Sequence, residues 1–286
     1  MTTYNEIYLI ARRRLRAAGI EAHDLEARLI CSFAAGKTRE EFFNASRFYV
    51  MDNAISESVD DMIERRLAGE PVAYLVGEWE FYGLPIIVND SVLIPRVDTE
   101  LLAEQAINLI RRRSGKTRLL DLCTGSGCLG IAVAVNSPNC RVVMADNSKK
   151  ALILCRENML INRATRNATA IEADALEKPP ALLGIFDVII CNPPYIPTDD
   201  LKNLDASVKD YEPLAALDGG SDGLDFYRAV SENWQALLKE GGHLAFECGV
   251  DQAPAVREIM DYSGLRNLRT YVDTLGIERV VVGRKR

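Results

Sequence analysis

Residues 119–130 are Leu119-Leu120-Asp121-Leu122-Cys123-Thr124-Gly125-Ser126-Gly127-Cys128-Leu129-Gly130. The apolar run at 118–123 predicts a buried strand, and residues 128–136 predict a helix after it. Glycine lets the backbone turn sharply between the two and lets a ligand approach the main chain closely. This strand, glycine turn and helix predict an α/β protein that binds its ligand at the carboxyl ends of its strands.

Strands and helices alternate through the rest of the chain. The further predicted strands are 141–146, 168–173, 186–191, 243–248, 268–273 and 278–283, and the further predicted helices are 148–162, 224–239 and 251–262. This alternation predicts a doubly wound, mostly parallel sheet with right-handed crossovers. The last two strands are too close in sequence to enclose a long helix, so the sheet is expected to end with antiparallel strands.

The residues before this region have a different pattern. Residues 1–72 carry apolar side chains at helical spacing and predict a small helical domain. Residues 73–95 contain two short β-rich runs around Gly83-Leu84-Pro85 and predict a β-hairpin linker. The larger domain is then expected to occupy residues 96–286.

The composition is that of a globular protein and disfavours several classes. The 286 residues are 48% hydrophobic and 26% charged, and the apolar runs are too short to span a membrane. Seven cysteines without CxxC pairs and only two histidines disfavour a disulfide framework, a zinc site and a histidine-based mechanism. The net charge of −7 disfavours a large nucleic-acid surface but leaves a local basic patch open. The N-terminus lacks a signal-peptide pattern, so a cytoplasmic protein with reduced thiols is expected.

Acidic residues at three predicted strands outline a cofactor site. Asp121 lies inside the first strand, four residues before Gly125, while Asp146 ends the second strand and Asp174 follows the third. Asp146 is placed either to accept hydrogen bonds from a ribose diol or to cap the helix that follows. The three glycines of the turn also fit a dinucleotide motif, so these residues alone leave NAD open as the cofactor.

The fourth predicted strand ends in Asn192-Pro193-Pro194-Tyr195. Each proline removes a backbone donor and fixes φ, so the chain leaves the sheet stiffly. The Asn192 carboxamide is thereby held at the ligand-binding edge of the sheet. A rigid carboxamide followed by an aromatic ring suits a planar substrate that carries an NH2 group.

Two motifs resemble those of methyltransferases that use S-adenosyl-L-methionine (AdoMet). Asp121-x-x-x-Gly125-x-Gly127 resembles their first motif, and Asn192-Pro193-Pro194-Tyr195 resembles the motif of enzymes that methylate the NH2 of adenine, cytosine or glutamine. Further blocks narrow the resemblance to the peptide chain release factor glutamine methyltransferases, the PrmC/HemK family. These blocks are residues 69–74, 79–81, 94–100, 211–213, 222–227 and 278–280.

This resemblance implies a fold and a reaction. The fold is a Rossmann-like class I AdoMet-dependent methyltransferase sheet, joined by the hairpin linker to a small N-terminal helical domain that binds the release factor. The reaction methylates the side-chain amide nitrogen of the glutamine in the Gly-Gly-Gln motif of class 1 peptide chain release factors and leaves S-adenosyl-L-homocysteine. A monomer is expected, without direct contact to nucleic acid or membrane.

The resemblance also implies the site residues. The Asn192 side chain and the Pro193 carbonyl each accept one hydrogen of the substrate amide, and Pro194 and Tyr195 complete the substrate site, Tyr195 by packing on the flat amide. Asp174 and Ala175 border the adenine ring. The implied cofactor-binding residues are Asp121, Cys123, Thr124, Gly125, Ser126, Gly127, Asp146, Asp174, Ala175 and Asn192.

Three positions depart from the family pattern. Val97 stands where Pro is usual, Cys123 where Gly is frequent and Cys248 where His is common. None of these changes removes a polar group that the chemistry requires. Two alternatives are a nucleic-acid adenine methyltransferase, which would need a basic groove, and an NAD-dependent oxidoreductase, which would give Asn-Pro-Pro-Tyr no role.

The segment before residue 101 offers further candidates. Arg96 and Glu100 are expected either to contact the substrate loop or to form an ion pair between the domains. Thr99 or Asp98 is expected to cap a helix that starts near Leu101.

Overall fold

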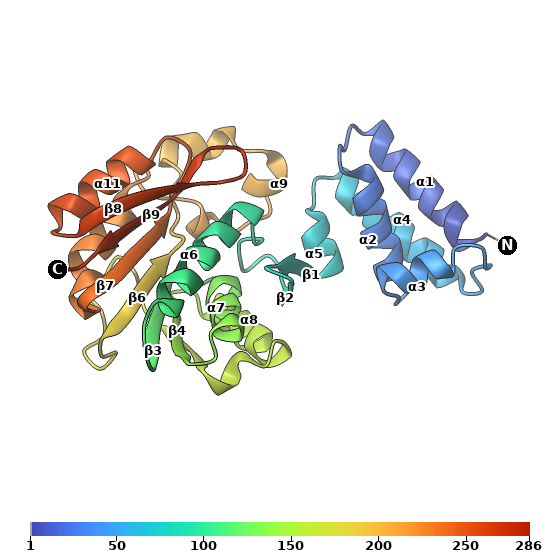
Figure 1. Cartoon of the computed structure of the whole chain (residues 1–286). Helices are drawn as coiled ribbons and strands as arrows, with labels where there is room; N and C mark the ends of the chain where they lie inside the picture. Colours follow the sequence, from blue (N-terminus) through green and yellow to red (C-terminus); the bar gives the residue numbers. More distant parts are fainter. Residues whose placement is uncertain (1) are drawn as a thin grey trace. The chain divides into compact units, whose positions relative to one another are not determined.

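A computed structural model describes residues 2–286. The chain divides into two compact units, Met1–Glu78 with Asp205–Tyr211 and Trp79–Leu204 with Glu212–Arg286. The first unit is helical, and the second is built on a large sheet (Figure 1). Asp205–Tyr211 belongs to the helical unit although it is distant in sequence, and the Tyr211 hydroxyl donates a hydrogen bond to the Ala68 carbonyl at 3.3 Å.

The helical unit has a hydrophobic core of its own. Its helices are α1 (Tyr4–Ala17), α2 (His23–Ala34), α3 (Arg39–Asn44), α4 (Asn53–Leu67), α5 (Val72–Val76) and the short α9 (Ala206–Lys209). Thr3 and Glu6 form a capping box that starts α1. The apolar faces of α1, α2 and α4 meet around Leu15, Ile30 and Ile63, which are fully buried.

The second unit is built on a seven-stranded sheet. Its strands are β3 (Thr117–Leu122), β4 (Cys140–Asp146), β5 (Ala168–Glu172), β6 (Phe186–Cys191), β7 (Leu238–Glu247), β8 (Arg266–Val272) and β9 (Glu278–Arg284), in the spatial order β5-β4-β3-β6-β7-β9-β8. Strands β3 to β7 are parallel, whereas β9 runs antiparallel to both β7 and β8. The predicted parallel sheet and its antiparallel end are confirmed. The strand order reverses between β3 and β6, where open α/β sheets bind ligands.

Helices cover both faces of this sheet. They are α6 (Glu100–Arg111), α7 (Cys128–Asn136), α8 (Lys149–Ile161), α10 (Asp225–Ala229) and α11 (Ala253–Tyr262), with short turns η1 (Val97–Thr99), η2 (Ala164–Arg166), η3 (Thr198–Asn203), η4 (Leu214–Ala216), η5 (Val230–Trp234) and η6 (Gln235–Leu237). Helices α6, α7 and α8 lie on one face, and α11 lies on the other (Figure 1). The short α10 and η5 pack on the same face as α11. Among residues 2–286, no helix is both long and apolar enough to cross a membrane.

Alternate residues of β3 show this division between the two faces. Leu120 and Leu122 pack into the core under η5 and α11, whereas Asp121 points toward α7. A Cβ on Gly130 of α7 would lie 2.4 Å from Met144 Cγ and 3.0 Å from Asp121 Oδ2. The third glycine of the motif therefore permits α7 to pack closely on the sheet.

The predicted helix at 224–239 is wrong in its extent. This segment instead forms the short α10, the π-helical turn η5 and the 3-10 turn η6, and β7 already begins at Leu238. The indole N–H of the fully buried Trp234 donates to the carbonyls of Ala175 and Glu177, each at 3.0 Å. Burial of this large ring with its donor satisfied overrides the regular helical spacing.

The hairpin consists of β1 (Glu78–Phe81) and β2 (Leu84–Ile87). Its turn is Tyr82-Gly83, not Gly83-Leu84-Pro85, and both turn residues have positive φ, as a two-residue hairpin turn requires. The fully buried Asn158 of α8 accepts a hydrogen bond from Ile87 N at 2.7 Å and donates to Ile87 O at 3.0 Å and Ser126 O at 2.9 Å. One side chain thus joins the hairpin to the glycine turn after β3.

Candidate active site

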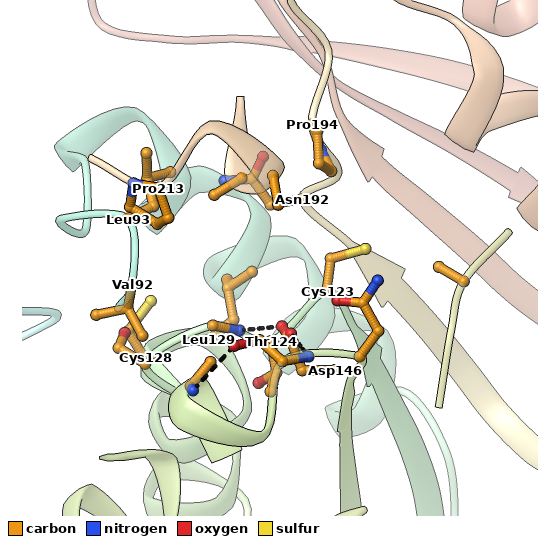
Figure 2. Close-up of a pocket in the computed structure, with 18 of the residues that line it drawn as sticks. Val92, Leu93, Cys123, Thr124, Cys128, Leu129, Asp146, Asn192, Pro194 and Pro213 are labelled. Atoms are coloured by element: carbon orange, nitrogen blue, oxygen red, sulfur yellow. Dashed lines mark hydrogen bonds between the residues drawn. The ribbon is translucent and has the colours of Figure 1, made fainter. Parts of the chain in front are cut away.

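A hollow opens at the carboxyl ends of the parallel strands (Figure 2). The loops after β3, β4, β5 and β6 line one side of it, and the segment that leads into α6 lines another. Its lining includes the predicted site residues Cys123, Thr124, Gly125, Ser126, Asp146, Asp174, Ala175, Asn192 and Pro194, and also Val92, Leu93, Pro95, Thr99, Pro213 and Phe226, which were not predicted as site residues. The fold therefore gathers most of the predicted residues around one hollow.

Asp146 ties the end of β4 to the glycine turn. Its Oδ2 accepts a hydrogen bond from Gly125 N and its Oδ1 accepts one from Ser148 N, each at 2.9 Å. Ser148, rather than Asp146, caps α8 by accepting a hydrogen bond from Ala151 N. Burial raises the pKa of Asp146, and the backbone hydrogen bonds partly offset this effect. The carboxylate thus remains at the edge of the hollow.

Asp121 and Gly127 do not line the hollow, although both were predicted to bind the cofactor. Asp121 is fully buried beneath the turn, where its Oδ2 accepts hydrogen bonds from Thr124 Oγ1 at 2.6 Å and Gly130 N at 2.9 Å. Burial raises the pKa of Asp121 to about 7, against the effect of these hydrogen bonds. Gly127 has φ of 84°, and a Cβ there would lie 2.7 Å from Cys155 Sγ. Asp121 and Gly127 therefore support the conformation of the turn without lining the hollow.

The loop after β5 forms a mixed polar and apolar wall. Asp174 accepts hydrogen bonds from Leu176 N at 2.9 Å and Asn147 Nδ2 at 3.3 Å. The adjacent Ala175 lines the hollow, as does Phe226 of α10. Two apolar surfaces beside a carboxylate suit a flat ring that carries a hydrogen-bond donor. In the sequence, Phe226 belongs to the family block 222–227 and carries no other signal of a site residue.

The Asn192 side chain has a fixed orientation at the end of β6. Its Nδ2 donates a hydrogen bond to Thr99 Oγ1 at 3.2 Å, and both residues line the hollow. Thr99 is the N-cap residue of α6, as expected, but its side chain makes no capping hydrogen bond there. Because Nδ2 is engaged by Thr99, the carboxamide oxygen is the group left free to accept hydrogen bonds from a substrate.

Glu247, at the end of β7, lies behind Asn192 and Thr99. It was not among the site residues predicted from the sequence. It is buried, and its Oε2 has no hydrogen-bond partner among the described residues. Burial raises its pKa to about 7, and hydrogen bonds with Thr99 and Asn192 act in the opposite direction. Glu247 ends a largely apolar run, and a glutamate at that position could equally point into solvent. The sequence therefore contains no signal that Glu247 is buried. The structure shows an inner layer of Glu247, Thr99 and Asn192.

Pro193 and Tyr195 do not line the hollow, although the sequence assigned both to the substrate. Pro193 is buried, and the Tyr195 ring packs against the core under α10 and α11. Burial raises the pKa of Tyr195 to about 12. Gln252 Nε2 donates to the Tyr195 carbonyl at 2.8 Å, and a Cβ on Gly219 would lie 2.7 Å from Tyr195 Cα. Tyr195 therefore anchors the loop after β6, which does not support the expected packing on a substrate amide.

Arg96 and Glu100 both have partners inside the second unit. Arg96 forms an ion pair with the buried Glu212, whose Oε2 also accepts a hydrogen bond from Ile94 N at 3.2 Å. Glu100 Oε1 accepts a hydrogen bond from Tyr82 N at 2.7 Å in the hairpin turn. The expected ion pair between the domains is therefore wrong for both residues. Through these two contacts Glu212 fixes the side of the hollow that includes Arg96.

The three departures from the family pattern have different surroundings. Cys123 has φ of 57°, a left-handed conformation that favours glycine, and it lines the hollow. Val97 is exposed at the start of η1, and Cys248 is buried outside the hollow, with Sγ 3.8 Å from Glu278 O. Across residues 2–286, no group of three or more His, Cys, Asp or Glu could hold a metal ion.

The fold and the hollow together define a class of protein. A mostly parallel sheet in this strand order, with carboxylates and a rigid carboxamide at its carboxyl edge, is that of a Rossmann-like class I AdoMet-dependent methyltransferase. A family model described as "Methyltransferase small domain" matches residues 97–206, and one described as "PrmC N-terminal domain" matches residues 6–77.

Relatives define the family within this class. A release factor glutamine methyltransferase of Thermodesulfovibrio yellowstonii is 40% identical over 231 residues, which are 80% of this chain and 82% of the relative. The enzyme of that name from Geobacter sulfurreducens is 37% identical over 294 residues, 99% of each chain. A solved methyltransferase from Pyrococcus furiosus, with 18% identity and a TM-score of 0.51, covers 79% of this chain and 98% of its own and is similar in fold alone. The chain belongs to the release factor glutamine methyltransferase family.

Proposed function

We propose that this chain methylates the side-chain amide nitrogen of the glutamine in the Gly-Gly-Gln motif of class 1 release factors. AdoMet is the methyl donor, and S-adenosyl-L-homocysteine is the product. Family membership supports the reaction. The single structural observation that carries the proposal is the orientation of Asn192, whose Nδ2 donates to Thr99 and whose oxygen is left to accept from an NH2 group. The seven cysteines are free thiols, which supports a cytoplasmic location.

AdoMet fits the residues that line the hollow. We assign its ribose hydroxyls to Asp146 and its adenine to the wall of Asp174, Ala175 and Phe226. The turn 123–127 contacts its methionine part. Carboxylates at this edge and no basic side chain in the turn suit a positively charged sulfonium better than the phosphates of a dinucleotide.

The chemistry requires the chain to orient a weak nucleophile. AdoMet supplies an activated methyl group, but an amide nitrogen shares its lone pair with its carbonyl. Asn192 Oδ1 accepts one amide hydrogen, and the Pro193 carbonyl accepts the second. These two acceptors fix the amide plane and favour the positive charge that develops on nitrogen. The amide proton leaves after transfer, so no strong general base is required.

Glu247 and Thr99 act behind Asn192 as positioning residues. An ionised Glu247 accepts the hydrogen of the Thr99 hydroxyl, which leaves Thr99 Oγ1 as the acceptor for Asn192 Nδ2. This chain of hydrogen bonds excludes the flipped carboxamide, in which a nitrogen would face the substrate. The buried carboxyl thereby determines which end of Asn192 the substrate meets.

The helical unit is proposed to bind the release factor at a distance from the glutamine. Its support is a short stretch with large apolar side chains in solvent: Phe43 is 72% exposed, Phe48 67% and Met51 82%. Exposed aromatic and methionine side chains that gather in this way are typical of protein interfaces. We propose residues 1–72 as this binding domain, 73–95 as the hairpin linker and 96–286 as the methyltransferase domain; residue 1 lies outside the described structure.

A binding and transfer experiment tests the class of reaction. Thermal unfolding is measured with AdoMet and with NAD, because a bound ligand raises the melting temperature. Methyl transfer from labelled AdoMet is then measured to a purified release factor and to adenine-containing DNA and RNA. We expect stabilisation by AdoMet alone and label in the release factor alone. Stabilisation by NAD, or label in nucleic acid but not in protein, would overturn the proposal.

A further inference from the structure

A second hollow lies on the sheet unit at the opposite end of β7 from Glu247. It is formed beyond the C-terminal end of α6, on the face of β7, β9 and β8 that α6 only partly covers. We call it the arginine pocket because it is lined by Arg112 and Arg113, which directly follow α6, and by Arg269 of β8 and Arg284 of β9. Its volume of about 410 Å³ is within the range of small-molecule sites, roughly 300–1,000 Å³.

The arginine pocket carries positive charge that the chain does not neutralise. Arg113 pairs with Asp187 at 3.0 Å. Within residues 2–286, the other three arginines form no ion pair, and Glu240 is the one carboxylate that lines the pocket. Unpaired arginines that lie close together repel each other. The pocket therefore concentrates positive charge in a chain whose net charge is −7. An anionic ligand would remove that repulsion.

His243 reports the positive field inside the pocket. Burial, followed by the charges of Arg113, Arg284, Arg112 and Arg269, lowers its pKa to about 4. Its Nδ1 lies 3.5 Å from Arg113 Nη2. The charged groups around it are these arginines with Asp187 and Glu240. The imidazole is therefore neutral at physiological pH and adds no charge of its own.

The pocket also has an apolar part. Tyr271 of β8 and Val282 of β9 line it beside the arginines. A neighbouring hollow shares Arg284 and is lined by Arg266, Lys285 and Arg286, so the basic surface continues past the pocket. Arginine forks match the oxygens of phosphate, and an aromatic ring offers a surface for a base or a sugar. These two features together match a nucleotide better than a simple anion.

We propose that the arginine pocket binds a nucleotide, with its phosphates on Arg112, Arg269 and Arg284 and its base or sugar against Tyr271. The same chemistry is present in a free nucleoside triphosphate and in a nucleotide unit of single-stranded RNA. This site lies outside the proposed methyl-transfer centre and is independent of that reaction. The pocket is a local basic patch of the kind that the net charge left open, and an RNA ligand would contradict the expectation of no direct contact with nucleic acid.

Histidine NMR on the full chain tests the proposal, because the chain has only two histidines and His23 lies in the helical unit. The His243 signal is titrated with acid alone, and with inorganic phosphate, adenosine triphosphate or a short single-stranded RNA. A bound phosphate should raise the pKa of His243 by about one unit or more and leave His23 unchanged. Response to the triphosphate identifies a free nucleotide, and response to RNA alone identifies a strand. No response to either overturns the proposal.

A matched pair of variants separates this pocket from general charge effects. Arg269→Gln with Arg284→Gln should weaken binding of the responding ligand by roughly tenfold or more for each arginine. Arg156→Gln with Arg257→Gln removes the same charge from exposed positions elsewhere on the unit and should leave affinity nearly unchanged. Equal losses in the two double variants would show non-specific attraction and overturn the assignment. Basal methyl transfer should be unaffected in both.

Discussion

The identity of Asn192 alone does not determine which group it presents to a substrate. A carboxamide presents either an acceptor or a donor, and the two orientations have nearly the same shape. The hydrogen bond from Nδ2 to Thr99 selects the acceptor orientation. The motif Asn-Pro-Pro-Tyr predicted where the carboxamide lies, but the residues that orient it come from η1 and β7, far away in sequence.

Removal of this acceptor should affect turnover without affecting the cofactor. We expect Asn192→Ala to lower kcat by about 100- to 1,000-fold, as for the loss of one aligned group that stabilises developing charge. Its AdoMet affinity, measured by calorimetry, should remain close to that of the wild type. Turnover close to wild type would contradict the role given to Asn192.

Asp146→Ala is the converse control for the same hollow. It should weaken AdoMet binding by roughly 1–3 kcal/mol, because hydrogen bonds to a charged group are lost. Turnover at saturating AdoMet should fall much less than in Asn192→Ala. Unchanged AdoMet affinity in this variant would argue against the ribose assignment.

Glu247 should give the reaction a pH dependence. Burial raises its pKa from 4.5 to about 7 against the hydrogen bonds with Thr99 and Asn192. Protonation turns this acceptor into a donor and releases the Thr99 hydroxyl. We expect kcat to fall as the pH drops through about 7, and Glu247→Gln to lose that step and to lower kcat at pH 8 by up to about 100-fold.

Glu247→Gln should raise the stability of the fold at pH 8 although it lowers kcat. Because the folded pKa lies above the unfolded one, the folded state binds more protons between pH 4.5 and 7, and stability is lost as the pH rises through this range. Glu247→Gln should therefore be more stable than wild type at pH 8, by on the order of 1.4 kcal/mol per pKa unit. Urea unfolding at pH 5 and pH 8 measures this. A variant that is less active and also less stable at pH 8 would indicate a structural role only.

At the scale of elements, buried polar ties hold the glycine turn in place. Asn158 of α8 bonds to both backbone groups of Ile87 and to the carbonyl of Ser126. We expect Asn158→Ala to lower the free energy of unfolding by roughly 2–4 kcal/mol, since it leaves buried backbone groups without partners. It should also raise the KM for AdoMet, because Ser126 lines the hollow.

Asn136→Ala is the matched control for this prediction. Asn136 is exposed and makes one hydrogen bond, from Nδ2 to the Ala132 carbonyl at 2.9 Å. Its loss should change the free energy of unfolding by about 0.5 kcal/mol or less. Similar losses in the two variants, measured by urea unfolding, would contradict the role of Asn158 as a tie.

The elements themselves were predictable to different degrees. All seven strands of the large sheet and helix 128–136 follow from apolar runs and glycine punctuation. The segment 224–239 does not, because the burial of Trp234 between distant loops determines its shape. Thr99 and Glu247 were not predicted as site residues for a related reason. A hydroxyl before a helix and a carboxyl at a strand end have common local roles, and only the fold places them beside Asn192.

At the scale of the whole molecule, two units with separate cores are expected to divide recognition from chemistry. Phe43→Ser with Phe48→Ser should raise the KM for an intact release factor by about tenfold or more, because exposed aromatic side chains often contribute most of the energy at an interface. AdoMet affinity and thermal stability should remain close to wild type, since neither side chain is part of the core.

Exposed apolar residues of the sheet unit provide the control. Tyr262 is 95% exposed and Leu275 is 82% exposed. The double variant Tyr262→Ser with Leu275→Ser should leave the KM for the release factor unchanged. If both double variants raise KM equally, the effect is not specific to the helical unit and its docking role is lost.

The most direct test of the account is the fate of the methyl group. Labelled AdoMet is incubated with the full chain and a purified class 1 release factor, and the product is digested and examined by mass spectrometry. We predict one methyl group on the side-chain nitrogen of the glutamine in Gly-Gly-Gln, and no label in a factor that carries Gly-Gly-Ala. Label that persists in the Gly-Gly-Ala factor, or that is absent from both, would contradict the assignment of Asn192 as an acceptor for a glutamine amide.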